Sequence, residues 1–209
     1  MVVALRKLAP SEVEEDGVVR LHEVSWDDFE QLLRMRGDHS GPRLTYLEGE
    51  VEIMSPSRNH EQIKSFIGCL VEVWCLEHGI DFSPYGAWTL KNKKKRRGAE
   101  PDECYVFGPQ NKHRPDLAIE VVWTSGRIDK LDVYRKLGVR EVWYWREGRL
   151  QAYLLRGEAY RAVAASKVLP GIDLAELARL IDRPTASQAI REYRALLARP
   201  GRRRRASPV

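Results

Sequence analysis

The sequence lacks the features that several protein classes require. It holds 3 cysteines in 209 residues, an odd number with no Cys-x-x-Cys spacing, so no paired disulfide framework is indicated. We therefore expect a reducing, cytoplasmic compartment. No stretch approaches about 18 uncharged apolar residues, and the first ten residues become charged too early for a signal peptide. We expect no membrane segment.

Several catalytic signatures are also missing. The five histidines are scattered, without an HExxH motif or paired spacing, which argues against a zinc hydrolase. The chain has no GxGxxG, no P-loop and no GxSxG, so the common dinucleotide, nucleotide and serine-hydrolase signatures are absent. No internal repeat is present.

What is present suits one α/β domain. The chain is 43% hydrophobic and 31% charged. A chain of this length buries enough surface to be stable without a disulfide or a structural metal. We expect a loose N-terminal segment over 1–17, a single domain over 18–198, and a basic disordered tail over 199–209.

The net charge of +5 is concentrated in two short runs on an acidic body. Five arginines lie in residues 199–209, and 91–97 reads KNKKKRR. Such runs can follow phosphates, and the second makes Lys93, Lys94, Lys95, Arg96 and Arg97 candidate contacts to nucleic acid. The alternative is a solvated loop and a disordered tail.

Hydrophobic periodicity predicts helices and strands in alternation. Ser25 is an expected helix N-cap, and Gly79 is expected to end the helix that starts near residue 59. The predicted strands are 18–24, 44–47, 51–54, 82–90, 102–107, 115–123, 140–146, 149–155 and 158–163. The predicted helices follow Ser25 and cover 59–77, 127–137, part of 169–181, and a last segment capped by Ser187. This pattern predicts a mixed central β-sheet flanked by helices.

Two carboxylates are predicted to meet inside this sheet. Strands 102–107 and 115–123 are joined by a short loop, so they should pair antiparallel. If Phe107 faces Pro115, Asp102 faces Glu120, with Cβ atoms about 4.5–5.5 Å apart. Such carboxylates repel unless a cation such as Mg²⁺ or Mn²⁺ bridges them. A slip of one residue would turn Glu120 to the other face, where it would be a solvent-facing or structurally paired acid.

Lys130 falls in the first turn of the 127–137 helix, ten residues after Glu120. A lysine there could point over the strand end, to help deprotonate a metal-bound water or to neutralise charge on a reacting phosphate. The alternative is a surface lysine paired with Asp129 or Asp132.

Taken in order, these segments resemble a known family. They are YLEGEVEIMSPSRNHEQI (46–63), EPD (100–102), RPDLAIEV (114–121), KLDVY (130–134), GVREVWYW (138–145) and LPGIDLAEL (169–177). The chain resembles a bacterial family of restriction-type endonucleases, long described as a domain of unknown function, in the PD-(D/E)XK nuclease superfamily. The resemblance covers about residues 19–180.

The resemblance implies a restriction-endonuclease-like core and a metal-dependent cut of a phosphodiester. Asp102, Glu120 and the Val121 carbonyl would hold Mg²⁺ or Mn²⁺, and Lys130 would be the catalytic lysine, with Lys136 a second choice. Glu50 and His60 would be accessory groups. Two departures from the family's pattern, Glu103 and the segment 122–126, affect the walls of the site and so the substrate preference.

We therefore expect a Mg²⁺-dependent endonuclease acting on DNA. One alternative is a nucleic-acid-binding or scaffold protein on the same fold without turnover, whose binding would survive EDTA. Another is a hydrolase of a different phosphodiester, such as RNA, because metal-and-lysine chemistry does not distinguish the sugar. A homodimer would suit cutting of both strands.

Overall fold

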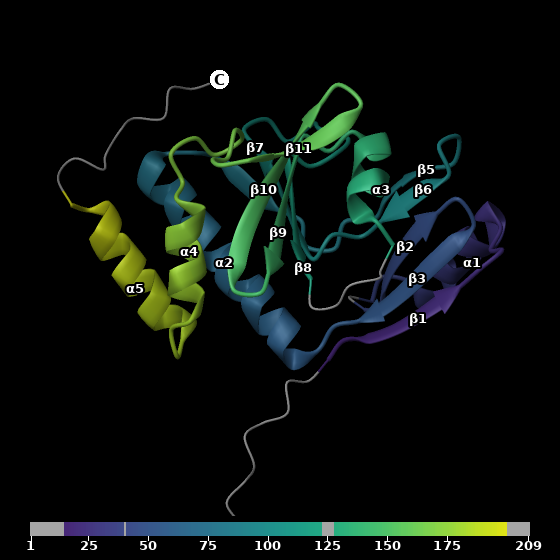
Figure 1. The fold of residues 1–209 in the computed structure, drawn as a ribbon, viewed down its shortest axis with the longest axis horizontal. Coiled ribbons are helices and arrows are strands. Elements are labelled where there is room, and N and C mark those ends of the chain that lie inside the picture. Colours follow the sequence, from purple (N-terminus) through teal and green to yellow (C-terminus); the bar gives the residue numbers. More distant parts are fainter. Residues whose placement is uncertain (1–14, 40, 123–127, 200–209) are drawn as a thin grey trace, which may run out of the picture.

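The computed structural model describes residues 15–39, 41–122 and 128–199. These residues form a layered α/β fold (Figure 1). In chain order its elements are β1 (Gly17–Leu21), α1 (Trp26–Arg36), β2 (Arg43–Leu47), β3 (Glu50–Ser55), α2 (Arg58–His78), β4 (Phe82–Pro84), β5 (Leu90–Asn92), β6 (Arg97–Ala99), β7 (Glu103–Phe107), β8 (Leu117–Val121), α3 (Lys130–Leu137), β9 (Glu141–Arg146), β10 (Arg149–Arg156), β11 (Ala159–Val163), α4 (Leu174–Ile181) and α5 (Ala186–Leu197).

The predicted mixed central sheet is confirmed. It has six strands in the order β11-β10-β9-β8-β7-β4. The β8–β9 pair is parallel and the remaining pairs are antiparallel, so α3 is the crossover between two parallel neighbours. The register of β7 on β8 places Cys104 opposite Ala118 and Tyr105 opposite Leu117, which is the predicted pairing.

A second, five-stranded antiparallel sheet was not foreseen, with the order β1-β3-β2-β6-β5. The predicted single strand over 82–90 is wrong, because the chain divides there between the two sheets. Pro84 ends β4, Gly86 adopts a left-handed conformation with φ of 52°, and Leu90 begins β5 in the other sheet. A proline and a positive-φ glycine both interrupt a strand.

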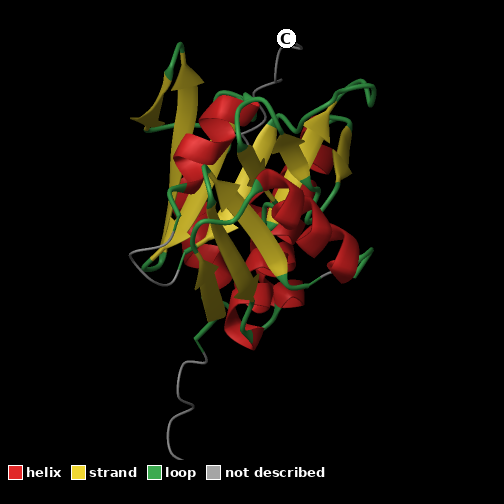
Figure 2. Cartoon of the chain, turned by 90° about the vertical axis from the view of Figure 1, so that its right-hand side faces the viewer, coloured by secondary structure: helices red, strands yellow, loops and turns green. Residues whose placement is uncertain are grey.

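Helices cover both faces of the central sheet (Figures 1 and 2). Leu117, Ile119 and Val121 of β8 pack with α2, α4 and α5 in the largest core cluster. Ala118, on the opposite face, packs with α3. Because side chains alternate along a strand, Glu120 shares the α3 face with Ala118. Helix α1 packs on the second sheet.

Capping side chains fix where the helices begin. Ser25 makes the predicted capping box with Asp28 at the start of α1, and Gly79 ends α2 in the left-handed conformation. The predicted cap of α5 is wrong: Thr185, not Ser187, accepts the backbone N–H of Gln188, at 3.2 Å. Ser187 lies one residue inside the helix.

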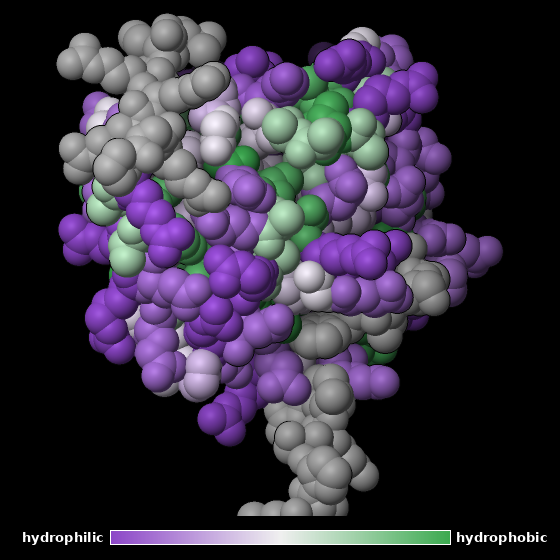
Figure 3. Space-filling model, turned by 60° about the vertical axis from the view of Figure 1, so that its left-hand side comes forward, coloured by the Kyte–Doolittle hydropathy of each residue, from purple (hydrophilic) through white to green (hydrophobic). Residues whose placement is uncertain are grey.

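Hydrophilic side chains predominate on the face drawn in Figure 3, with hydrophobic ones confined to small patches between them. Over the described ranges, every helix is too short or too polar to span a bilayer.

Candidate active site

Asp102 and Glu120 lie side by side at one end of the β7–β8 pair. Asp102 directly precedes β7, and continuing the observed register from Glu103 opposite Ile119 sets it against Glu120. Asp102 is 0% exposed and Glu120 is 1% exposed. Two buried carboxylates cannot both stay ionised without cations or hydrogen-bond donors close to them.

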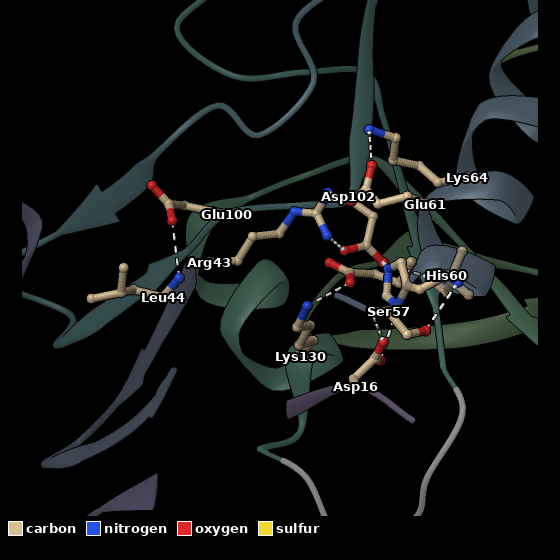
Figure 4. A network of polar contacts seen from close by, with 12 residues as sticks. Asp16, Arg43, Leu44, Ser57, His60, Glu61, Lys64, Glu100, Asp102 and Lys130 are labelled. Atoms are coloured by element: carbon tan, nitrogen blue, oxygen red, sulfur yellow. Dashed lines mark hydrogen bonds and ion pairs between the residues drawn. The ribbon is translucent and has the colours of Figure 1, made fainter. Parts of the chain in front are cut away.

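Asp102 receives three contacts (Figure 4). Arg43, the first residue of β2, donates from Nη1 to Oδ1 at 2.8 Å, and the backbone N–H of Val121 donates to Oδ2 at 2.7 Å. His60 Nε2 lies 2.9 Å from Oδ2, an ion-pair contact without the alignment of a hydrogen bond. Arg43 of the second sheet and His60 of α2 therefore contact the same carboxylate, that of Asp102.

His60 also connects the site to the N-terminal segment. Its Nδ1 lies 2.9 Å from Oδ2 of Asp16, whose other oxygen accepts the backbone N–H of Ser57 at 2.8 Å. Ser57 is the N-cap of α2 and accepts the backbone N–H of His60 at 3.2 Å. Asp16 therefore holds the start of α2, although it falls in the segment 1–17 that was expected to be loose.

Glu120 is held from α3. Lys130 donates from Nζ to Oε2 at 2.5 Å, and the Tyr134 hydroxyl donates to Oε1. Residues four apart lie on one face of a helix, so one side of the first turn of α3 presents both groups to the sheet. Asp129 caps this helix by accepting the backbone N–H of Leu131 at 3.0 Å.

The charges in this cluster change each other's proton affinity. Burial alone would raise the pKa of Asp102, but Lys130, then His60 and Arg43, hold it well below its usual range. Burial raises the pKa of Glu120, and the charge of Asp102 adds to this against the opposing effect of Lys130. Burial would lower the pKa of His60, but Asp102 and Asp16 raise it to about 9. The site therefore favours a charged Asp102 and a protonated His60.

Asp102 and Glu120 have lone pairs left that could take a small divalent cation. A carboxylate offers about four lone pairs, and the described contacts occupy three on Asp102 and two on Glu120. Within the described ranges, no group of three or more His, Cys, Asp or Glu side chains could by itself hold a metal ion. Mg²⁺ usually takes only one or two carboxylates and completes its shell with water and substrate phosphate.

Other predicted site residues lie elsewhere or act differently. Glu50 points to the surface, where its side chain is 53% exposed and lies 3.7 Å from His22. The predicted role of Val121 was its carbonyl, whereas the contact observed here comes from its N–H. Of the residues predicted as central or accessory, the structure brings together Asp102, Glu120, Lys130, Val121 and His60.

The lysine-rich run forms the β5–β6 hairpin, and much of it is already paired. Lys91 and Lys93 bind Glu30 and Asp27 of α1 at 2.8 and 2.9 Å. Arg97 is 5% exposed and binds Glu48 and Asp132 at 2.9 and 2.8 Å, which ties the hairpin to α3. Lys94 has no acidic partner in the described part of the chain. Arg97 thus acts as a structural cation here.

Sequence reasoning missed four residues at or beside the cluster: Arg43, Asp16, Tyr134 and Glu52. Glu52 is a buried acid of β3 whose Oε2 accepts the backbone N–H of Ile128. Arg43 directly precedes the predicted strand 44–47, and only its two-residue spacing from Thr45 indicates that the two side chains share a strand face. The sequence indicated Tyr134 only as part of the KLDVY segment (130–134). Its four-residue spacing from Lys130 was the signal that it faces the same carboxylate.

The comparison with protein families identifies the chain. The family Uma2, described as "Putative restriction endonuclease", matches residues 26–182. The chain belongs to the Uma2 family. The Uma2 match runs from α1 through α4, so it includes Asp102, Glu120 and Lys130, and it confirms the resemblance expected from the sequence.

Among solved structures, the chain is similar to a putative nuclease belonging to DUF820 from Anabaena variabilis ATCC 29413. The identity is 14%, the TM-score is 0.49, and the similarity covers 81% of this chain and 98% of that chain. No curated protein matches the sequence.

Proposed function

We propose that this Uma2 protein is a metal-dependent endonuclease that hydrolyses phosphodiester bonds in DNA. The observation that carries the proposal is the buried pair Asp102–Glu120, with Lys130 bound to one carboxylate and His60 beside the other. Burying two acids is unfavourable unless they have a ligand or cationic partners, and such strained ionisable clusters are concentrated at functional sites. Membership of the Uma2 family supports nuclease chemistry at this cluster.

Each residue has a role that follows from its contacts. Asp102 and Glu120 would hold Mg²⁺ or Mn²⁺, with the Val121 carbonyl as a further ligand. When bound, the cation supplies a Lewis acid and lowers the pKa of the attacking water. Lys130 is an ammonium paired with Glu120, so we assign it to stabilising negative charge on the phosphate oxygens. Arg43 and His60 fix the orientation of Asp102.

Two adjoining clefts support nucleic acid as the substrate. One of about 530 Å³ includes Lys112, His113, Arg114 and Arg140, and another of about 310 Å³ includes Lys95, His113, Arg114 and Lys136. We call this combined surface the basic cleft. Lys136 lies six residues after Lys130 on α3, about 9 Å along the helix. Neither cleft is lined by Asp102, Glu120 or Lys130, so the basic cleft would bind phosphates away from the cut site.

The test is nicking of supercoiled plasmid at low salt with Mg²⁺, Mn²⁺ or EDTA. Asp102→Asn is preferred to Asp102→Ala, because alanine would leave Arg43 and His60 buried without their partner. We expect metal-dependent nicking by the wild type, and its loss in Asp102→Asn and Lys130→Met. Glu77→Gln, which neutralises an exposed acid paired with Arg194, is the control and should cut normally.

The same experiment separates the alternatives. Plasmid that is retarded on the gel but never cut, with or without EDTA, would contradict the proposal and favour a binding protein. Cutting of an RNA substrate but not of plasmid would keep the chemistry and change the substrate. The homodimer and the cytoplasmic location stay predictions from the sequence.

A further inference from the structure

Glu52 is a buried acid on the side of the second sheet that faces the catalytic cluster. It lies in β3, opposite Arg20 of β1 and Thr45 of β2, and is 1% exposed. Directly opposed residues share a sheet face, and so do residues two apart in a strand. Glu52 therefore lies on the same face as Thr45 and Arg43, and the guanidinium of Arg43 reaches Asp102.

One oxygen of Glu52 has no hydrogen-bond donor among the residues that the structure describes. Oε2 accepts the backbone N–H of Ile128 at 3.3 Å and Nη2 of Arg20 at 3.4 Å, both long contacts. Oε1 is buried without a hydrogen-bond partner among the described residues. A bare oxygen on a buried carboxylate costs stability and calls for a functional explanation.

Lys130 is a cation of the cluster that could use that oxygen. The amide that binds Glu52 belongs to Ile128, two residues before Lys130. Burial lowers the pKa of Lys130, but Glu120 and Asp102 raise it and Glu52 adds to their effect, so the charge of Glu52 is felt at Nζ. Without metal, Nζ is committed to Glu120 Oε2 at 2.5 Å.

A divalent cation bound at Glu120 would compete with Lys130 for the same carboxylate and repel its ammonium. We propose that Glu52 is a positioning residue that accepts Lys130 through Oε1 when Glu120 engages the cation. This inference rests on the proposed metal-dependent function. Glu120 and Glu52 are then alternative acceptors for the Lys130 ammonium. Lys130 stays charged and within the cluster whether or not the cation is bound.

The proposal is tested by measuring Mn²⁺ affinity in the absence of substrate, from the free Mn²⁺ signal in electron paramagnetic resonance. The proteins are the wild type, Glu52→Gln, Lys130→Met and the double variant. We expect Glu52→Gln to weaken Mn²⁺ binding about tenfold, because Lys130 then remains on Glu120. In the Lys130→Met background the same substitution should change the dissociation constant less than about twofold, since no lysine needs a second acceptor.

Glu77→Gln is the control, since Glu77 is an exposed acid of α2 paired with Arg194, and it should bind Mn²⁺ like the wild type. Equal weakening by Glu52→Gln with and without Lys130 would overturn the proposal and make Glu52 act on the cation itself. No weakening in either background would also overturn it. Absence of Mn²⁺ binding by the wild type would instead contradict the proposed metal site, and this inference with it.

Discussion

At the scale of single residues, the site consists of acids held in place by cations from other parts of the chain. Arg43 joins β2 to Asp102 at 2.8 Å and to Glu61 of α2 at 2.7 Å, while its own side chain is only 4% exposed. Removing one member of a buried pair leaves an uncompensated charge, which is more costly than losing a surface pair.

Replacing Arg43 by Met should therefore lower the free energy of unfolding of the metal-free protein by about 3 kcal/mol. The control is Lys91→Met, which removes a partly exposed pair with Glu30 and should cost less than about 1 kcal/mol. Both values come from urea denaturation in EDTA. Equal stability of the two variants would mean that Arg43 contributes little to holding Asp102.

Single residues also show what the sequence could and could not predict. Asp102 and Glu120 were predicted because a short loop restricts the strand pairing and a single acid inside an apolar strand requires an explanation. Lys130 was predicted from its place in the first turn of the next helix and from the resemblance to the family. Arg43, Asp16 and Glu52 come from segments 50 or more residues away from Glu120, and no local pattern reports such distant contacts. Their positions depend on how the second sheet packs, which is a property of the folded chain.

At the scale of helices and strands, periodicity predicted the positions of the helices better than their ends. Helix α2 spans Arg58–His78 against a predicted 59–77, but the cap of α5 was misplaced by two residues. Ser187 and Thr185 are both good capping residues, and only the backbone conformation selects between them. Thr185 has the extended conformation of an N-cap, with φ of −142° and ψ of 149°.

Replacing Thr185 by Ala should destabilise the protein by about 1 kcal/mol, because the N–H of Gln188 loses its acceptor. Ser187→Ala, inside the first turn, should be neutral within about 0.5 kcal/mol, since alanine is the better helix former there. Thermal denaturation of the two variants measures this difference. A larger loss from Ser187→Ala would contradict the observed start of α5.

At the scale of the whole molecule, two sheets meet at one cluster. The central sheet supplies Glu120, the second sheet supplies Arg43, and α2 and α3 supply His60 and Lys130. The sequence predicted the mixed central sheet because its strands are joined by a short loop or a single helix. It did not predict the second sheet, because pairing of β1 with β3 and of β2 with β6 joins strands that are distant along the chain.

The distribution of charge gives a prediction at the same scale. Arg114→Ala and Arg140→Ala, in the basic cleft, should each weaken DNA binding and reduce the dependence of log K on log salt by about one. Arg191→Ala, on the exposed side of α5, is the control and should leave both quantities unchanged. Equal effects of all three variants in fluorescence anisotropy titrations would indicate attraction by the overall charge rather than a specific cleft.

The central claim is that Asp102 and Glu120 form a divalent-cation site. The most direct measurement is anomalous diffraction from a crystal of the wild-type protein loaded with Mn²⁺, compared with Asp102→Asn treated in the same way. The account predicts a manganese peak in contact with oxygens of both carboxylates in the wild type, and its loss in the variant. A wild-type crystal with no manganese at these carboxylates, or a peak that persists unchanged in Asp102→Asn, would contradict it.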